Sequence, residues 1–164
     1  MGKITAAVVL AVLAAVGLSG EERRPPRQVT AQEMAIVVVI GRSLGFEESL
    51  VREMVESESS GNVNALGPAG WDGARCRGLL QINPRFQDEL VRKHFPHPAS
   101  TFDVWDPIDN VTVALGYLAA LFRERGSLEV ALWVYGCGYS DPARVPEQVK
   151  DYARKIIAAG GRRW

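Results

Sequence analysis

Cysteine is scarce in this chain of 164 residues, and its ionisable side chains leave no net charge. Two cysteines are too few for a disulfide-built miniprotein or a four-cysteine zinc site. Nineteen Lys and Arg residues balance nineteen Asp and Glu residues, whereas proteins that bind nucleic acid through its phosphates carry a clear basic excess. We therefore expect no nucleic-acid partner. The rest of the composition is average, which excludes a disordered or fibrous chain.

The first twenty residues form a segment of their own. Lys3 precedes an apolar run over residues 4–18, and the small residues Ser19 and Gly20 follow it. This pattern is typical of a secretory signal over residues 1–20. The run is short for a spanning helix, which needs about 20 apolar residues, yet an uncleaved membrane anchor over residues 4–20 remains an alternative. Either reading predicts that the working domain lies outside the cytoplasm, in the periplasm, the cell wall or the medium.

The remaining chain predicts one all-α domain over residues 30–160, after a linker rich in Pro and Arg over residues 21–29. Helix starts are indicated by Thr30 with Glu33, by Asn83 and Asp106 before prolines, and by Ser127. The expected helices cover residues 30–45, 47–57, 83–94, 106–126, 127–135 and 146–160. No segment has a convincing strand pattern. The long glycine-containing loop over residues 61–77 is of a length that usually carries function.

One glutamate in the second helix has an unusual position. Leu50, Val51, Met54 and Val55 define a buried face by their three- and four-residue spacing, and Glu58 falls on the same face. Burial and the negative end of the helix both disfavour its ionised form, so its pKa is expected to be raised. A carboxylic acid of this kind can protonate a glycosidic oxygen near neutral pH. The alternative is an ordinary helix-end glutamate that turns toward solvent.

Four segments in order resemble the motifs of lytic transglycosylases with the soluble-lytic-transglycosylase (SLT), lysozyme-like domain. Residues 58–65, Glu-Ser-Ser-Gly-Asn-Val-Asn-Ala, are similar to the first motif, and residues 78–83, Gly-Leu-Leu-Gln-Ile-Asn, to the second. Asp106-Pro107 with Asn110 and Tyr117-Leu118 resembles the third, and Ala131-Leu132 through Tyr135 to Gly138 resembles the fourth. Together the motifs cover residues 47 to about 155.

The resemblance implies a lysozyme-like fold and an enzyme that cleaves the β-1,4 bond between MurNAc and GlcNAc in peptidoglycan glycan strands. Glu58 matches the single catalytic acid and base of that family, in which the sugar's own 6-hydroxyl attacks and leaves a 1,6-anhydro product. Tyr135 matches the tyrosine that reaches the catalytic glutamate. Ser59, Gln81 and Asn83 match positions expected to bind substrate. No metal and no cofactor is implied, and we expect a monomer.

Two departures from the family pattern keep other functions open. The loop before Gly78 resembles that of goose-type lysozymes, with Asp72 at the position of an aspartate that places water, while Asn83 replaces their second aspartate. A hydrolytic muramidase using Glu58 and Asp72 is therefore the first alternative. Gly136 replaces the asparagine of the fourth motif, so the second alternative is a catalytically silent glycan-binding or assembly protein on the same scaffold.

Other side chains are candidates for smaller roles. Trp71, Trp105 and Tyr139 lie in loops and could stack on sugar faces, although loop aromatics often pack against their own loop. Cys76 lies in the loop before the second motif, and Cys137 lies in the fourth motif. The resemblance implies that both motifs border the substrate cleft, so the two cysteines could form a disulfide or remain two thiols.

Overall fold

The computed structural model describes residues 24–70 and 73–160, and within them the chain forms six α-helices, one short 3₁₀ helix and one two-stranded sheet. The helices are α1 (Ala31–Ser43), α2 (Glu48–Ser59), α3 (Pro84–His94), α4 (Pro107–Arg125), α5 (Leu128–Cys137) and α6 (Glu147–Gly160). The 3₁₀ helix η2 covers Ala99–Thr101. The predicted all-α, lysozyme-like class is confirmed. The predicted signal or anchor segment lies outside the described residues.

The helix starts follow the local signals of the sequence. Thr30 and Glu33 form a reciprocal capping box at the start of α1. The side chains of Asn83, Asp106 and Ser127 accept hydrogen bonds from backbone N–H groups in the first turns of α3, α4 and α5. Each cap satisfies N–H groups that have no partner inside the helix. These starts depend on residues two or three positions apart, which explains why the sequence predicts them.

The helix ends differ more from the expected positions. Helix α1 ends at Ser43, before the predicted stop at Gly45. Helix α2 continues two residues past Ser57 and ends where Ser60 adopts a left-handed conformation, with φ 50° and ψ 38°. Helix α5 continues through Gly136 and ends at Gly138, which has φ 78°. Glu58 therefore lies in the last turn of α2 rather than after it.

The loop over residues 61–77 contains a hairpin that the sequence did not predict. Strand β1 (Leu66–Ala69) pairs with β2 (Arg75–Arg77) in antiparallel orientation, with Leu66 opposite Arg77. Both strands are too short to show an alternating pattern, and β1 contains Gly67 and Pro68, which strands usually avoid. The pairing is thus visible only when the two segments are placed together.

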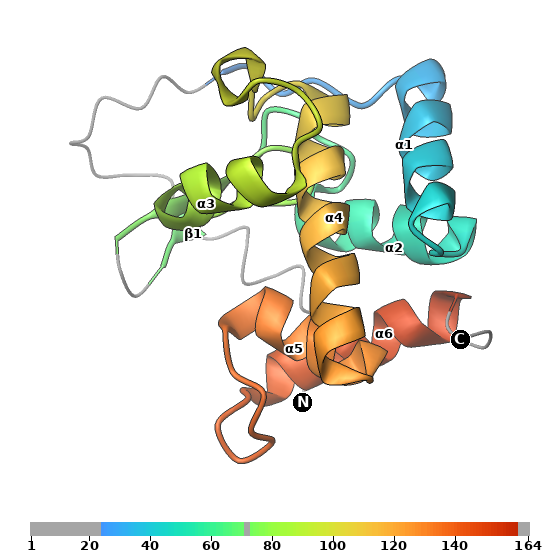
Figure 1. Cartoon of the computed structure of the whole chain (residues 1–164), viewed down its shortest axis with the longest axis vertical. Helices are drawn as coiled ribbons and strands as arrows, with labels where there is room; N and C mark the ends of the chain where they lie inside the picture. The colour runs from blue at the N-terminus through green and yellow to red at the C-terminus, as the bar shows by residue number, and fades with distance from the viewer. Residues whose placement is uncertain (1–23, 71–72, 161–164) are drawn as a thin grey trace, which may run out of the picture.

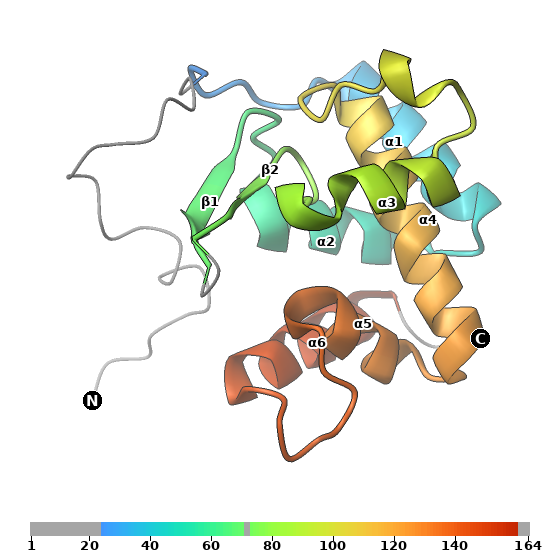
Figure 2. The same cartoon turned by 60° about the vertical axis from the view of Figure 1, so that its left-hand side comes forward.

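Helix α4 runs through the middle of the molecule and contacts α1, α3 and α5, while α6 contacts α2 and α5 (Figure 1). Its buried side chains include Val111, Leu115 and Leu118, which form one core with Leu50 and Met54 of α2. Among the described residues, none of the helices is both long and apolar enough to span a bilayer. Helices α5 and α6 lie together on one side of this core, with α3 and the hairpin on the other (Figure 2).

Candidate active site

Glu58 lies on the buried side of α2, in the last turn of that helix. Leu50, Val51, Met54 and Val55 of the same face are at most 2% exposed, and the Glu58 side chain is half-buried beside them. The helical spacing that places these residues on one face is therefore borne out. The next residues turn away from the helix axis, because Ser60 ends α2 in a left-handed conformation.

Burial raises the pKa of the Glu58 carboxyl from 4.5 to about 7. Removing a carboxylate from water disfavours its charged form, which is the cause expected from its place on an apolar face. The prediction of a raised pKa is confirmed. A group with this pKa is present in both its acid and its base form near neutral pH, which suits a residue that donates a proton and later accepts one.

The neighbouring glutamates of α2 are in different surroundings. The Glu53 carboxylate accepts a hydrogen bond from Ser57 at 3.1 Å and forms an ion pair with Lys155 of α6 at 2.5 Å. Glu56 is exposed. Of these three glutamates, Glu58 is the one that lies on the apolar face of α2. The tertiary structure thus separates a structural carboxylate from a candidate acid.

Tyr152 of α6 is the nearest polar partner of Glu58. Its hydroxyl interacts with the Glu58 carboxyl and lowers the pKa of that carboxyl, partly offsetting the effect of burial. Burial and the negative charge of Glu58 in turn raise the pKa of Tyr152 well above 10. The hydroxyl is buried. It forms no hydrogen bond of good geometry with any of the described residues.

The sequence did not single out Tyr152. It lies on the same apolar stripe of α6 as Val149 and Ile156, which favours a core residue, and nothing local shows that α6 packs against α2. A tyrosine on a buried helix face brings a hydroxyl that needs a hydrogen-bond partner. This is the one signal in the sequence that could have indicated an interaction between Tyr152 and a polar group.

Tyr135 of α5 is also close to Glu58, but its hydroxyl is used elsewhere. It donates a hydrogen bond to the carbonyl oxygen of Leu80 at 2.7 Å. Burial, and after it the negative charge of Glu58, raise the pKa of Tyr135 well above 10. The structure therefore brings Tyr135 to the site, as the sequence motif indicates, while joining it to the second motif rather than to the carboxyl.

Asn110 of α4 holds the second motif in place. Its side-chain oxygen accepts from Leu80 N at 2.8 Å, and its amide donates to the carbonyl oxygens of Arg77 and Val104 at 3.1 and 3.0 Å. The residue is fully buried. Gly78 has φ 78°, and a Cβ atom there would lie 2.2 Å from the Asn110 amide nitrogen. Glycine at position 78 therefore allows the second motif to approach α4 closely.

Three predicted substrate-binding side chains are engaged within the protein. Gln81 has φ 50° and donates through its amide to the carbonyl oxygens of Gly78 and Ala65. Ser59 is buried and donates to the carbonyl oxygen of Val55 in its own helix. Asn83 caps α3. These contacts within the protein shape the loops around Glu58. Substrate binding by the three side chains stays a prediction.

The remaining candidates are spread around the molecule. Tyr139 is 41% exposed, with the Arg144 guanidinium 4.1 Å from its ring centre. Trp71 and Asp72 lie outside the described residues, so the possible second carboxylate stays a prediction. Cys76 and Cys137 are thiols with no disulfide between them. The described part of the chain also contains no group of three or more His, Cys, Asp or Glu side chains able to hold a metal ion.

Comparison with known families decides the class of this site. The sequence model of the transglycosylase SLT domain matches residues 40–158, which include α2 to α5 and nearly all of α6. The chain belongs to the transglycosylase SLT family. Members of this family act on peptidoglycan, so the SLT domain of this chain is a peptidoglycan-degrading enzyme domain. The search of curated proteins found no match to this sequence.

Proposed function

We propose that this SLT domain is a lytic transglycosylase that cleaves the β-1,4 bond between MurNAc and GlcNAc, with Glu58 as general acid and base. One observation carries the proposal: a buried carboxyl with a pKa of about 7, inside the region that matches the family. A raised pKa of this kind is characteristic of the acid in glycoside-cleaving enzymes.

The proposed reaction needs one carboxyl group. Glu58 in its acid form gives its proton to the bridging oxygen as the bond from C1 of MurNAc to that oxygen breaks. The 6-hydroxyl oxygen of the same MurNAc then bonds to C1, and its proton passes to the Glu58 carboxylate. The products are a free GlcNAc 4-hydroxyl and a 1,6-anhydro-MurNAc end, and Glu58 is again protonated.

An internal nucleophile explains why no second carboxylate is required, whereas most glycosidases use two. The environment of Glu58 fits this simpler arrangement. Within the described residues, the causes that shift its pKa are burial and the Tyr152 hydroxyl, with no contribution from another carboxyl group.

The position of Gly136 also bears on the catalytically silent alternative. A Cβ atom at this residue would lie 3.1 Å from Cγ1 of Val149, so the position faces α6. Glycine here lets α5 and α6 pack closely, and α6 carries Tyr152 toward Glu58. Helix packing thus accounts for glycine, rather than the family's asparagine, at position 136. This explanation favours a catalytically active domain over a silent one.

The first experiment combines a variant with identification of the products. Glu58→Gln keeps the shape of the side chain but cannot donate a proton, and we expect it to lower the rate of peptidoglycan cleavage by about 10²–10⁴-fold. Glu56→Gln, on the exposed side of the same helix, is the matched control and should retain wild-type activity. Unchanged lysis by Glu58→Gln would contradict the proposal.

Mass spectrometry of the muropeptides distinguishes the two reactions that Glu58 could support. A transglycosylase releases ends that are one water lighter than reducing ends, because the 6-hydroxyl replaces water as the nucleophile. Release of ordinary reducing ends would instead indicate a muramidase, and Asp72→Asn would then be the next variant.

We also propose that the enzyme works outside the cytoplasm, where peptidoglycan is found, after export by residues 1–20. The basic start, apolar run and small residues of that segment support this location. N-terminal sequencing of the protein recovered from the periplasm or medium tests it. A protein retained in the cytoplasm would contradict the proposal, and recovery of the intact N-terminus in the membrane would identify an anchor.

A further inference from the structure

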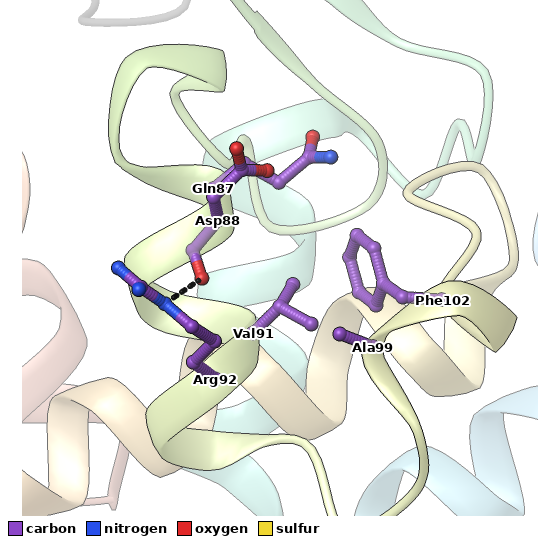
Figure 3. A pocket seen from close by; sticks show the side chains of 6 residues that line it. All are labelled: Gln87, Asp88, Val91, Arg92, Ala99 and Phe102. Atoms are coloured by element: carbon purple, nitrogen blue, oxygen red, sulfur yellow. Dashed lines mark hydrogen bonds between the residues drawn. The ribbon is translucent and has the colours of Figure 1, made fainter.

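A hollow lies between α3 and η2, and Glu58 is not among the residues that line it (Figure 3). Its volume is about 390 Å³. The side chains that line it come from two turns of α3 and from η2 with its following residue: Gln87, Asp88, Val91, Arg92, Ala99 and Phe102. None of these residues belongs to the four motifs, and the proposed cleavage reaction does not use them.

Gln87 brings an unsatisfied polar group to this hollow. Its side-chain oxygen is buried and has no hydrogen-bond partner among the residues that the structure describes. A buried acceptor of this kind costs about 1–3 kcal/mol of stability, and most native structures avoid one. The side chain extends from α3 toward the side where Phe102 lies (Figure 3). A ligand that donates a hydrogen bond here would supply the partner that the protein lacks.

Two charged side chains flank the same space. Asp88 and Arg92 both line the hollow, and the Arg92 guanidinium is turned away from Phe102 (Figure 3). Arg92 donates through Nε to the backbone oxygen of Asp88 at 3.2 Å. Neither charge forms an ion pair among the described residues. On the neighbouring positions of α3, by contrast, Lys93 and Glu89 pair at 2.6 Å.

The floor and the far wall of the hollow are apolar. Val91 is 4% exposed, and Phe102 is half-buried with its ring edge-on to Phe95 at 5.4 Å. An aliphatic chain could pack against these groups, and an aromatic face also attracts a cation. A lining that combines apolar side chains with the oxygen acceptors of Gln87 and Asp88 fits an aliphatic chain that ends in an ammonium group.

We propose that this hollow binds the peptide part of peptidoglycan through the ammonium-bearing side chain of its diamino-acid residue. The ammonium group is held by the Asp88 carboxylate and by the Gln87 oxygen, which reaches it after rotation about the terminal side-chain bond. Arg92 is placed to bind a carboxylate of the same peptide. The inference assumes the peptidoglycan substrate of the proposed function and adds a site separate from the cleavage site.

Calorimetry with the full chain tests the site directly. The probe is the synthetic peptide L-Ala–D-Glu–L-Lys–D-Ala, compared with the same peptide acetylated on the lysine side chain. Acetylation removes the charge, and we expect it to weaken binding about fivefold, as for loss of one exposed ion pair. Asp88→Asn and Gln87→Leu should each weaken binding of the unmodified peptide to a similar extent, while Glu89→Gln, on the paired side of α3, should not.

A second readout separates a ligand-binding role from a structural one. Gln87→Leu removes a buried acceptor without a partner, so its melting temperature should equal or exceed that of the wild type. Peptide binding that is unchanged in both Asp88→Asn and Gln87→Leu would overturn the inference, and so would no measurable binding to the wild type at millimolar peptide. Equal binding of the acetylated peptide would also overturn it.

The two proposals can fail independently. Cleavage of glycan strands that lack peptides should be unaffected by Asp88→Asn and Gln87→Leu, and peptide binding should be unaffected by Glu58→Gln. Loss of cleavage in Glu58→Gln with no peptide binding therefore contradicts only this further site. Peptide binding without any cleavage contradicts only the proposed function.

Discussion

At the scale of single residues, the chemistry of the site depends on the interactions of the Glu58 carboxyl and of the Tyr135 and Tyr152 hydroxyl groups. Glu58 lies on an apolar face, and burial raises its pKa to about 7. Tyr135 donates to the Leu80 carbonyl oxygen, so the Tyr152 hydroxyl is the one left to interact with the carboxyl. The helical spacing of α2 predicts the first of these facts. The choice between the two tyrosines depends on atoms far apart in the sequence.

Tyr152→Phe should change the pH dependence of the reaction. The Tyr152 hydroxyl lowers the pKa of Glu58, so its loss should move that pKa above 7 and shift the alkaline limb of kcat/KM to higher pH. Activity on peptidoglycan measured from pH 5 to 9 checks this.

The exposed Tyr139→Phe is the control for Tyr152→Phe and should keep the wild-type profile. Tyr152→Phe should still fold normally, since the Tyr152 hydroxyl forms no hydrogen bond of good geometry with any described residue. A pH profile identical to that of the wild type would show that Tyr152 is only a core residue.

At the scale of elements, the site depends on how closely the second motif approaches α4. Asn110 forms hydrogen bonds with the backbone on both sides of Gly78, at Arg77 and Leu80, and with the carbonyl oxygen of Val104. Gly78 leaves room for the Asn110 amide. The resemblance of residues 78–83 to a family motif is visible in the sequence. The reason for its glycine is visible only in the structure, where a side chain would overlap a helix that begins about thirty residues later.

Gly78→Ala should lower the free energy of unfolding by about 3 kcal/mol or more, because it combines a positive φ with a steric clash. Gly126→Ala is the matched control: its φ is also positive, at 65°, but no atom lies within 4 Å of the added Cβ. For the control we expect the free energy of unfolding to fall by about 1–2 kcal/mol, which is the cost of the left-handed conformation alone. Urea unfolding measures both, and equal losses would contradict the close-approach argument.

At the scale of the whole molecule, α2 and α6 come together although most of the domain separates them in the sequence. Their contact brings Tyr152 to Glu58 and pairs Lys155 with Glu53. Helix α5 supports this arrangement, because Gly136 leaves room for Val149 of α6. The raised pKa of Glu58 is therefore a property of the packed domain, and the burial of this carboxyl must affect the stability of the fold.

The stability of the domain should fall as pH rises from about 5 to 8. The folded chain keeps the Glu58 proton up to pH about 7, whereas the unfolded chain loses it near 4.5, so the folded state binds more protons between these values. The contribution is constant below 4.5 and decreases as pH rises through 7. Over this range the wild type should lose about 3 kcal/mol relative to Glu58→Gln.

Urea unfolding of both proteins at pH 5 and pH 8 checks this pH dependence. Glu56→Gln, at an exposed position, should follow the wild type. Parallel behaviour of the wild type and Glu58→Gln would mean that the carboxyl is not buried in solution.

The sequence alone determined the helix starts, the resemblance to the family and the apolar helix face that carries Glu58. Thr30, Asn83, Asp106 and Ser127 cap the first turns of their helices, and such contacts span only two or three residues. The apolar face that includes Glu58 is likewise set by spacing within one helix. Local patterns of this kind are readable without knowledge of the rest of the fold.

Only the tertiary structure decided which groups interact across the domain. It paired β1 with β2, joined the Tyr135 hydroxyl to the Leu80 carbonyl oxygen and brought Tyr152 to Glu58. It also left the side-chain oxygen of Gln87 without a hydrogen-bond partner among the described residues. A buried polar group takes whichever partner the packing brings within reach, and that packing is set by apolar contacts among many helices at once. No local pattern records these distances, so they emerge only when the core is assembled.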